Sequence, residues 1–197
     1  MPGKKKRPRG KGLSAFEKVL VAALLVVAIW GAYSVLQPSP PSTETTTGNV
    51  APDFTLPEID RNGLTGRQVS LSSFRGKVVL LEFMEPWCGH CQKMMPALES
   101  LHNQFGPQNV VFLSVAGPWN DPSTGRPTSA EDVAKFIGDY QSNLIYVYDG
   151  SGTVFSTYGV KGTPTFFILG KDGSIGPRYE GEVSPETLAA DISRQNV

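Results

Sequence analysis

Two cysteines stand three residues apart in the run Trp87-Cys88-Gly89-His90-Cys91, and they are the only cysteines in the 197-residue chain. At the start of a helix, residues i and i+3 share one face, so two thiols with this spacing lie within mutual reach. Such a pair can close and open a disulfide and thereby carry two electrons. We therefore predict dithiol–disulfide exchange at this site.

Two other uses of these cysteines compete with exchange. A structural disulfide that closes so small and strained a loop would gain little stability. A metal site needs about four ligands, and Cys88, His90, Cys91 and the distant His102 do not obviously converge. We expect no metal and place His102 on the helix surface, while a copper-binding or copper-delivery protein stays the alternative function.

The sequence around the motif predicts an α/β domain in which strands and helices alternate. Apolar or alternating runs predict strands at 53–56, 68–71, 77–84, 110–116, 144–148, 165–169 and 175–181. Helical spacing predicts a helix over 88–105. A second helix is capped by Thr128 or Ser129 and runs to about Gln141, and Ser184 before Pro185 opens a third. The order βαβ then αββα predicts a central sheet with helices on both faces.

The motifs and this element order resemble the thioredoxin superfamily. Trp-Cys-x-x-Cys at 87–91 is followed much later by Gly-Thr-Pro-Thr at 162–165, and Pro96 matches the family's helix kink. The opening Ala-Pro-Asp-Phe-Thr-Leu at 51–56 is similar to membrane-anchored extracytoplasmic thioredoxins of the TlpA/ResA type. Residues 86–91 look like the Cys-Gly-His-Cys active site of protein disulfide isomerase. The resemblance covers 51–197 and implies a thioredoxin fold, with a central mixed β-sheet flanked by helices.

The resemblance and the physics of a helix terminus together give roles to the catalytic residues. Cys88 is expected at the helix N-terminus, where free N–H groups favour a thiolate, so it is the nucleophile. Cys91 is expected to be buried and to resolve the mixed disulfide. His90 would add partial positive charge near the thiolate. Glu82, six residues before Cys88, would be a buried carboxyl that takes the proton of Cys91.

Three further residues are expected to meet the substrate. Trp87 would shield one side of the disulfide, and Thr163 with a cis Pro164 would offer backbone polar groups to a substrate chain. Glu85 is expected to be exposed to solvent near the motif. A peroxidase on the same fold is disfavoured, because Glu85 stands where a Thr or Ser would be needed.

The N-terminal residues predict a membrane anchor. Residues 1–18 form a basic tail, and 19–36 is an uncharged run of 18 residues with Trp30 and Tyr33 near its far end. At about 1.5 Å per residue, this run can just cross a hydrocarbon core of about 30 Å. Basic residues before a span stay in the cytoplasm, so the thioredoxin-like domain is expected in an extracytoplasmic position.

A cleaved signal peptide is the competing interpretation of the same run. Residues 19–29 are short enough for its apolar region, and Ala32-Tyr33-Ser34 is a tolerable cleavage site. The protein would then be secreted. In both cases the Pro-, Ser- and Thr-rich residues 37–50 form an extended linker, and the folded domain covers 51–197.

Charge and composition limit the partners. The chain has 18 basic and 18 acidic residues, but seven of the basic ones and a single acidic one lie within residues 1–18. The remainder is acidic, so no nucleic-acid partner is expected. We expect protein substrates with thiols or disulfides, a redox partner protein in the membrane, and no bound cofactor. The direction of electron flow stays open between an oxidase or isomerase and a reductase, such as one serving cytochrome c maturation.

Overall fold

The computed structural model describes residues 49–196. The predicted basic tail, the apolar run 19–36 and nearly all of the linker lie outside these residues. Within 49–196, none of the helices combines the length and the apolar character needed to cross a membrane.

One mixed sheet forms the centre of the described domain, as predicted. Its seven strands lie in the order β2-β1-β5-β4-β3-β6-β7. Strand β3 pairs in parallel with β4, and β4 with β5, while the remaining neighbours are antiparallel. The strands are β1 (Thr55–Asp60), β2 (Gly63–Ser70), β3 (Val78–Met84), β4 (Val110–Ala116), β5 (Ile145–Tyr148), β6 (Thr165–Leu169) and β7 (Ile175–Glu180).

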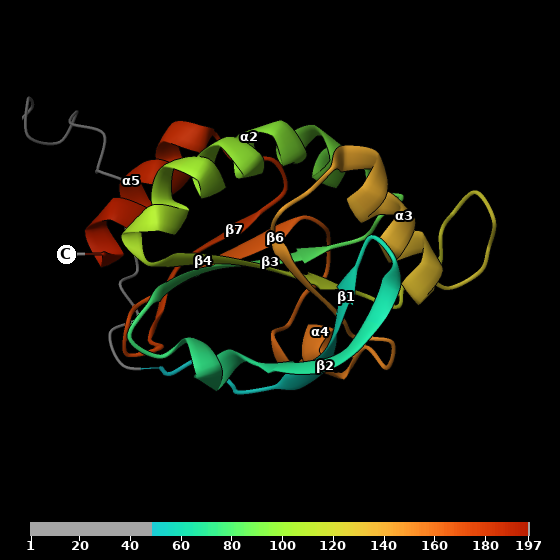
Figure 1. Cartoon of the computed structure of the whole chain (residues 1–197), viewed down its shortest axis with the longest axis horizontal. Helices are drawn as coiled ribbons and strands as arrows, with labels where there is room; N and C mark the ends of the chain where they lie inside the picture. The colour runs from blue at the N-terminus through green and yellow to red at the C-terminus, as the bar shows by residue number, and fades with distance from the viewer. Residues whose placement is uncertain (1–48, 197) are drawn as a thin grey trace, which may run out of the picture. The chain divides into compact units, whose positions relative to one another are not determined.

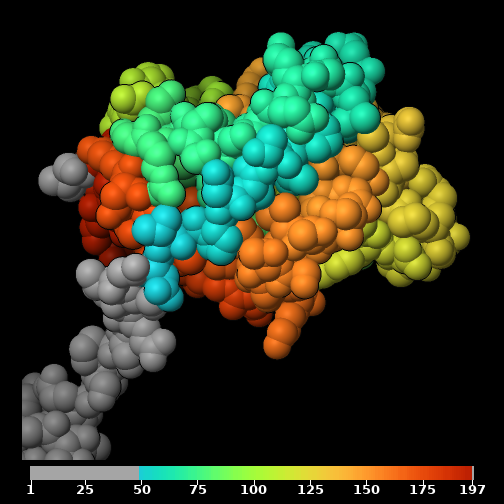
Figure 2. Space-filling view, turned by 90° about the horizontal axis from the view of Figure 1, so that it is seen from below, coloured from blue at the N-terminus to red at the C-terminus, as the bar shows by residue number. Residues whose placement is uncertain are grey.

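Helices cover both faces of this sheet. Figure 1 shows α2 (Gly89–Phe105) and α5 (Pro185–Gln195) side by side over one face, with α3 (Ala130–Tyr140) beyond them. Their apolar residues and one face of the strands form a single buried cluster. The short α4 (Thr153–Thr157) and the 3-10 turn Leu71–Phe74 pack against the other face. Figure 2 shows this second side from below, with β1 and β2 in cyan to green beside the orange α4.

Strand β3 positions the cysteine motif. All seven of its residues are buried, because β4 and β6 flank it and helices cover it from both sides. The near-continuous apolar run of a strand buried on both faces predicted this element almost to the residue. The chain leaves the sheet at Met84, four residues before Cys88, so the motif lies at the carboxyl end of the central strand.

Most predicted boundaries agree with the structure, and the first hairpin is the main exception. Strand β1 runs over Thr55–Asp60 instead of 53–56, and β2 over Gly63–Ser70 instead of 68–71. The start is later because the Asp53 side chain accepts hydrogen bonds from the N–H groups of Phe54 (3.0 Å) and Ser72 (2.9 Å). Those bonds occupy groups that a strand would pair with a neighbour.

Helix α4 was not predicted, because five residues are too few to show a helical period. Its first turn is held by the buried Asp149, whose Oδ2 accepts from the N–H groups of Val154 (2.8 Å) and Phe155 (3.0 Å). Helix α3, in contrast, begins with the predicted cap: the Ser129 side chain accepts from Asp132 N, and the Asp132 carboxylate accepts from Ser129 N.

The packing of β3 gives a stability prediction. Leu81 is completely buried in this strand, so Leu81→Ala should leave a cavity and lower the free energy of unfolding by about 2–5 kcal/mol. Urea denaturation followed by circular dichroism measures the change. The matched control is Leu64→Ala, because Leu64 is 55% exposed and should shift stability by less than about 0.5 kcal/mol. Equal losses from both variants would contradict the assigned burial.

Candidate functional site

The two thiols lie at the N-terminus of helix α2. Cys88 is the N-cap residue, and its Sγ accepts a hydrogen bond from the N–H of Cys91 at 3.2 Å. Cys91 lies one turn deeper and is completely buried, whereas 6% of Cys88 is exposed. Both are free thiols, so the structure describes the reduced pair. The spacing of the motif therefore brings the two sulfurs together, with one closer to the surface.

The helix terminus stabilises the thiolate of Cys88. The Cys91 side chain, the Thr163 side chain and the backbone N–H groups of Cys91 and His90 lower the pKa of Cys88 to about 5, against the opposing effect of burial. Donors at a helix N-terminus are free to make such bonds because they have no partner within the helix. Cys88 is therefore ionised at neutral pH.

The environment of Cys91 has the opposite effect. Burial, the neighbouring Cys88 side chain and the Glu82 carboxylate raise the pKa of Cys91 far above that of a free thiol. Loss of hydration penalises the charged form, and a nearby negative charge penalises it further. Cys91 therefore stays protonated until a base takes its proton. One thiol of the pair is ready to attack, and the other is held in reserve.

The loop before β6 faces the nucleophile. The Thr163–Pro164 peptide bond is cis, as predicted. In its thiol form Cys88 Sγ donates to the carbonyl oxygen of Thr163 at 3.3 Å. The antiparallel pairing of β6 with β3 carries this loop to the end of the sheet where the motif lies.

Glu82 is a buried carboxyl on β3. It is 2% exposed, and its Oε2 accepts from Ser114 Oγ on the neighbouring β4 at 2.7 Å. Its Oε1 is buried and accepts no hydrogen bond from any residue in 49–196. Burial raises the pKa of Glu82 to about 7, although the bond from Ser114 opposes the rise. A carboxyl with this pKa can exchange a proton at neutral pH.

Glu85 is a second buried carboxyl, and the prediction that it is exposed is wrong. Its exposed fraction is 0%. Burial raises the pKa of Glu85 to about 7, against hydrogen bonds from Thr128 Oγ1 (2.6 Å) and Trp119 N (2.9 Å). The sequence did contain a signal for this burial: Glu85 directly follows a buried strand, and no turn residue separates it from that strand. Its partners come from the 117–128 segment, which no local pattern connects to the motif.

Trp87 and His90 flank the cysteines in different ways. Trp87 is half-buried, and its indole Nε1 donates to Thr128 Oγ1 at 3.1 Å. His90 is exposed, and its Nδ1 pairs with Glu182, which also accepts from Lys93 Nζ at 3.3 Å. The imidazole is thus held by a carboxylate, while the backbone N–H of His90 is the group that acts on the Cys88 thiolate. The predicted influence of the His90 ring stays a prediction.

His102 lies only partly on the surface, where full exposure was predicted. It is half-buried on α2, its ring packs edge-on against Phe112 of β4 at 5.5 Å, and its Nδ1 has no hydrogen-bond partner within the described residues. Residues 49–196 also contain no cluster of three or more His, Cys, Asp or Glu side chains suited to a metal ion. No observation in this part of the chain favours the copper-delivery alternative.

Known proteins are similar to this chain in sequence and fold. The AhpC/TSA family matches residues 47–177, which is more than half of the chain. The thiol-disulfide oxidoreductase ResA of Geobacillus thermodenitrificans is 30% identical over 146 residues, covering 74% of this chain and 76% of that protein.

Two solved structures are also similar. A protein from Chlorobium tepidum assigned as the thiol:disulfide interchange protein DsbE has a TM-score of 0.64 and 27% identity, over 79% of this chain and 100% of that one. The exposed lipoprotein thioredoxin Etrx1 of Streptococcus pneumoniae has a TM-score of 0.58 and 26% identity, over 73% and 99%. The chain therefore belongs to the AhpC/TSA family and, within the thioredoxin superfamily, to its ResA-like thiol–disulfide oxidoreductases.

Proposed function

We propose that this enzyme exchanges disulfides with protein substrates outside the cytoplasm through Cys88 and Cys91. The observation that carries the proposal is the asymmetry of the pair. Cys88 has a pKa near 5 at the helix N-terminus, and the buried Cys91 donates its backbone N–H to the Cys88 sulfur. Exchange requires a thiolate that attacks and a second thiol that waits.

The reaction follows from this asymmetry. The Cys88 thiolate attacks one sulfur of a substrate disulfide, that disulfide breaks, and a mixed disulfide forms while the leaving thiolate takes up a proton. Cys91 then loses its proton and attacks the Cys88 sulfur. The mixed disulfide breaks, the Cys88–Cys91 disulfide forms, and the substrate leaves with two electrons and two thiols. The same steps in reverse oxidise a substrate dithiol.

Glu82 is the group we assign to the proton of Cys91. Its carboxylate lies close enough to raise the pKa of Cys91, and its own pKa near 7 places the ionised form at physiological pH. The buried Oε1 keeps its lone pairs available, because no residue in 49–196 donates to it. A base with this pKa can accept the proton as Cys91 attacks and return it later.

The substrate chain is assigned to the surface around Cys88. Thr163 and Pro164 belong to the loop that contacts the Cys88 sulfur. Trp87 directly precedes Cys88 in the sequence. His90 lies on the exposed side of the helix terminus, where a partial positive charge on its ring would add to the stabilisation of the thiolate. These contacts use backbone groups and a flat indole, which suit substrates that differ in sequence.

The location outside the cytoplasm rests on the N-terminal sequence and on one relative. The basic tail 1–18 and the apolar run 19–36 form a single-pass anchor or an export signal. The similar Streptococcus protein is described as exposed and as a lipoprotein. We infer that the linker 37–50 holds the domain away from the membrane, where a membrane redox partner renews the cysteine pair.

The direction of electron flow depends on the reduction potential of the pair. A stabilised thiolate favours the reduced form and makes the disulfide more oxidising. Equilibration of the protein with glutathione measures this reduction potential. A potential of about −180 mV assigns oxidation or isomerisation, and a potential below about −250 mV assigns reduction, as in cytochrome c maturation.

The order of attack gives the first functional prediction. Cys91→Ser should accumulate mixed disulfides with substrate proteins, because the resolving thiol is missing. Cys88→Ser should form none and should lose all activity. Non-reducing gels and mass spectrometry of proteins bound to each variant measure this. Accumulation with Cys88→Ser instead would reverse the assigned roles.

The proton of Cys91 gives a second prediction. Wild-type turnover should rise with pH through about 7, as Glu82 ionises. Glu82→Gln keeps an acceptor for Ser114 but cannot take a proton, so turnover above pH 7 should fall roughly 100-fold and the rise should disappear. The control is Glu131→Gln, which removes an exposed carboxylate on α3. A pH profile unchanged by Glu82→Gln would exclude Glu82 from the mechanism.

A further inference from the structure

Glu85 connects the cysteine motif to a distant part of the chain. It lies one residue after β3 and three before Cys88, with an exposed fraction of 0%. Its Oε1 accepts from the backbone N–H of Trp119 at 2.9 Å, and its Oε2 accepts from Thr128 Oγ1 at 2.6 Å. One carboxyl thus holds both ends of the 117–128 segment.

Thr128 also contacts Trp87, the residue next to the nucleophile Cys88. Its Oγ1 accepts from Trp87 Nε1 at 3.1 Å, and its carbonyl oxygen accepts from Tyr148 Oη at 2.7 Å. Thr128 is 3% exposed, so little water competes for these bonds. Trp87, Thr128 and Glu85 form one polar chain: the Thr128 oxygen accepts from the indole, and its hydroxyl donates to the carboxyl at 2.6 Å, with the Trp119 carbonyl oxygen as a longer second acceptor at 3.2 Å.

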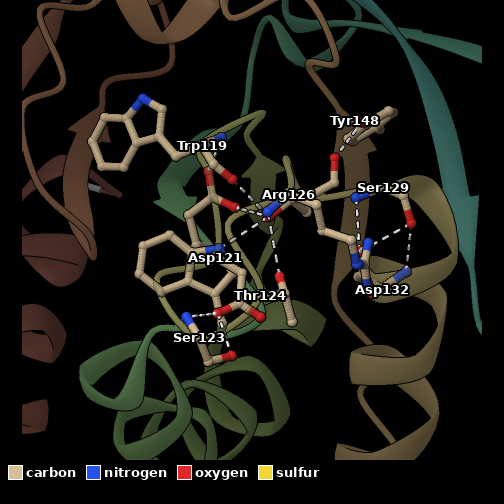
Figure 3. Close-up of polar contacts among 11 residues, drawn as sticks. Trp119, Asp121, Ser123, Thr124, Arg126, Ser129, Asp132 and Tyr148 are labelled. Carbon is tan, nitrogen blue, oxygen red and sulfur yellow. Dashed lines mark hydrogen bonds and ion pairs between the residues drawn. The ribbon is translucent and has the colours of Figure 1, made fainter.

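The 117–128 segment makes hydrogen bonds both within itself and to the start of α3. Figure 3 shows Arg126 against Asp132, joined by two bonds of 2.7 Å, and Asp132 in turn pairs with Ser129 at the start of α3. The Asp121 side chain closes a turn with Ser123. At the base of the segment, a Cβ on Gly117 would lie 2.3 Å from Phe155, so only glycine fits there. Glu85 therefore anchors a segment whose conformation is fixed by these contacts.

Trp87 forms part of the wall of a groove beside the cysteines. The groove has a volume of about 460 Å³ and lies between the motif and α3, lined among others by Pro86, Trp87, Asp121, Asp132 and Phe136. The 117–128 segment contributes Asp121 to its lining, the motif contributes Trp87, and α3 contributes most of the remaining residues. The shape of this surface depends on where the indole and the segment are held.

We propose that Glu85 is a positioning residue for disulfide exchange: through the Thr128 hydroxyl and the Trp119 amide it fixes the Trp87 indole and the 117–128 segment as the substrate-binding wall beside Cys88. The proposal rests on the proposed function and deepens it, because it places the substrate protein in the groove between the motif and α3. Glu85 exchanges no proton with the cysteines in this role.

The test uses variants of Thr128 and Glu85 in the full chain, with insulin as the substrate and dithiothreitol as the reductant. Thr128→Val removes the hydroxyl, so KM for insulin should rise roughly three- to ten-fold while kcat changes less than about twofold. Thr128→Ser keeps the hydroxyl and should restore KM. Glu85→Ala should match Thr128→Val, and Glu85→Gln, which can still accept from Trp119 N, should remain near wild type.

Two controls separate positioning from a general loss of structure. Thr157→Val removes an exposed hydroxyl on α4, on the other face of the sheet, which donates to the Thr153 carbonyl oxygen, and KM should not change. The indole N–H resonance of Trp87 should shift in Thr128→Val and not in Thr128→Ser, since only the first breaks its hydrogen bond.

The possible failures are distinguishable. A wild-type protein that reduces no insulin would overturn the proposed function and this inference with it. An active wild type whose KM is the same in Thr128→Val and Thr128→Ser would overturn the inference alone. The same conclusion would follow if the Trp87 resonance did not respond to Thr128→Val.

Discussion

The rest of the site depends on the contact between the Cys88 sulfur and the first turn of helix α2. The N–H of Cys91 points at that sulfur at 3.2 Å, so the helix terminus stabilises a negative charge there. The same turn places Cys91 on the buried side. The Cys91 side chain and the backbone donors of this turn lower the pKa of Cys88, while burial raises the pKa of Cys91, so one thiol ionises and the other stays protonated. Strand β3 fixes this geometry, because it is buried on both faces and ends four residues before Cys88.

Burial also explains why two carboxyls lie near the pair. Glu82 and Glu85 are both nearly inaccessible to solvent, and burial raises the pKa of each to about 7. Their hydrogen bonds differ, however, and so do their roles. Glu82 keeps one oxygen without a partner in the described part of the chain, which suits a proton acceptor. Both oxygens of Glu85 are engaged by the 117–128 segment, which suits a group that holds structure in place.

The sequence predicted those features that have a local cause. The runs at 77–84, 110–116 and 165–169 are mostly apolar because both faces of these strands are covered, and they match β3, β4 and β6 within a residue. Capping residues located the start of α3 and α5, and the Trp-Cys-x-x-Cys spacing located the thiols.

What the sequence could not predict has its cause in residues far along the chain. Glu85 is buried because Trp119 and Thr128, more than thirty positions later, satisfy its oxygens. The imidazole of His90 is held by Glu182, which lies 92 positions away. His102 turns toward Phe112 of the sheet, although its place on the helix indicated a surface position. Which side chains contact these residues is decided by the packing of the whole fold and not by the neighbouring amino-acid sequence.

The central claim is that the fold separates the two thiols into an ionised nucleophile and a protonated reserve. A pH titration of the reduced full-length protein, followed through the ¹³Cβ resonances of both cysteines, tests this most directly. The account predicts that Cys88 titrates with a midpoint near pH 5, while Cys91 shows no titration up to about pH 9. Ordinary midpoints near about pH 8.5 for both thiols, or ionisation of Cys91 before Cys88, would contradict it.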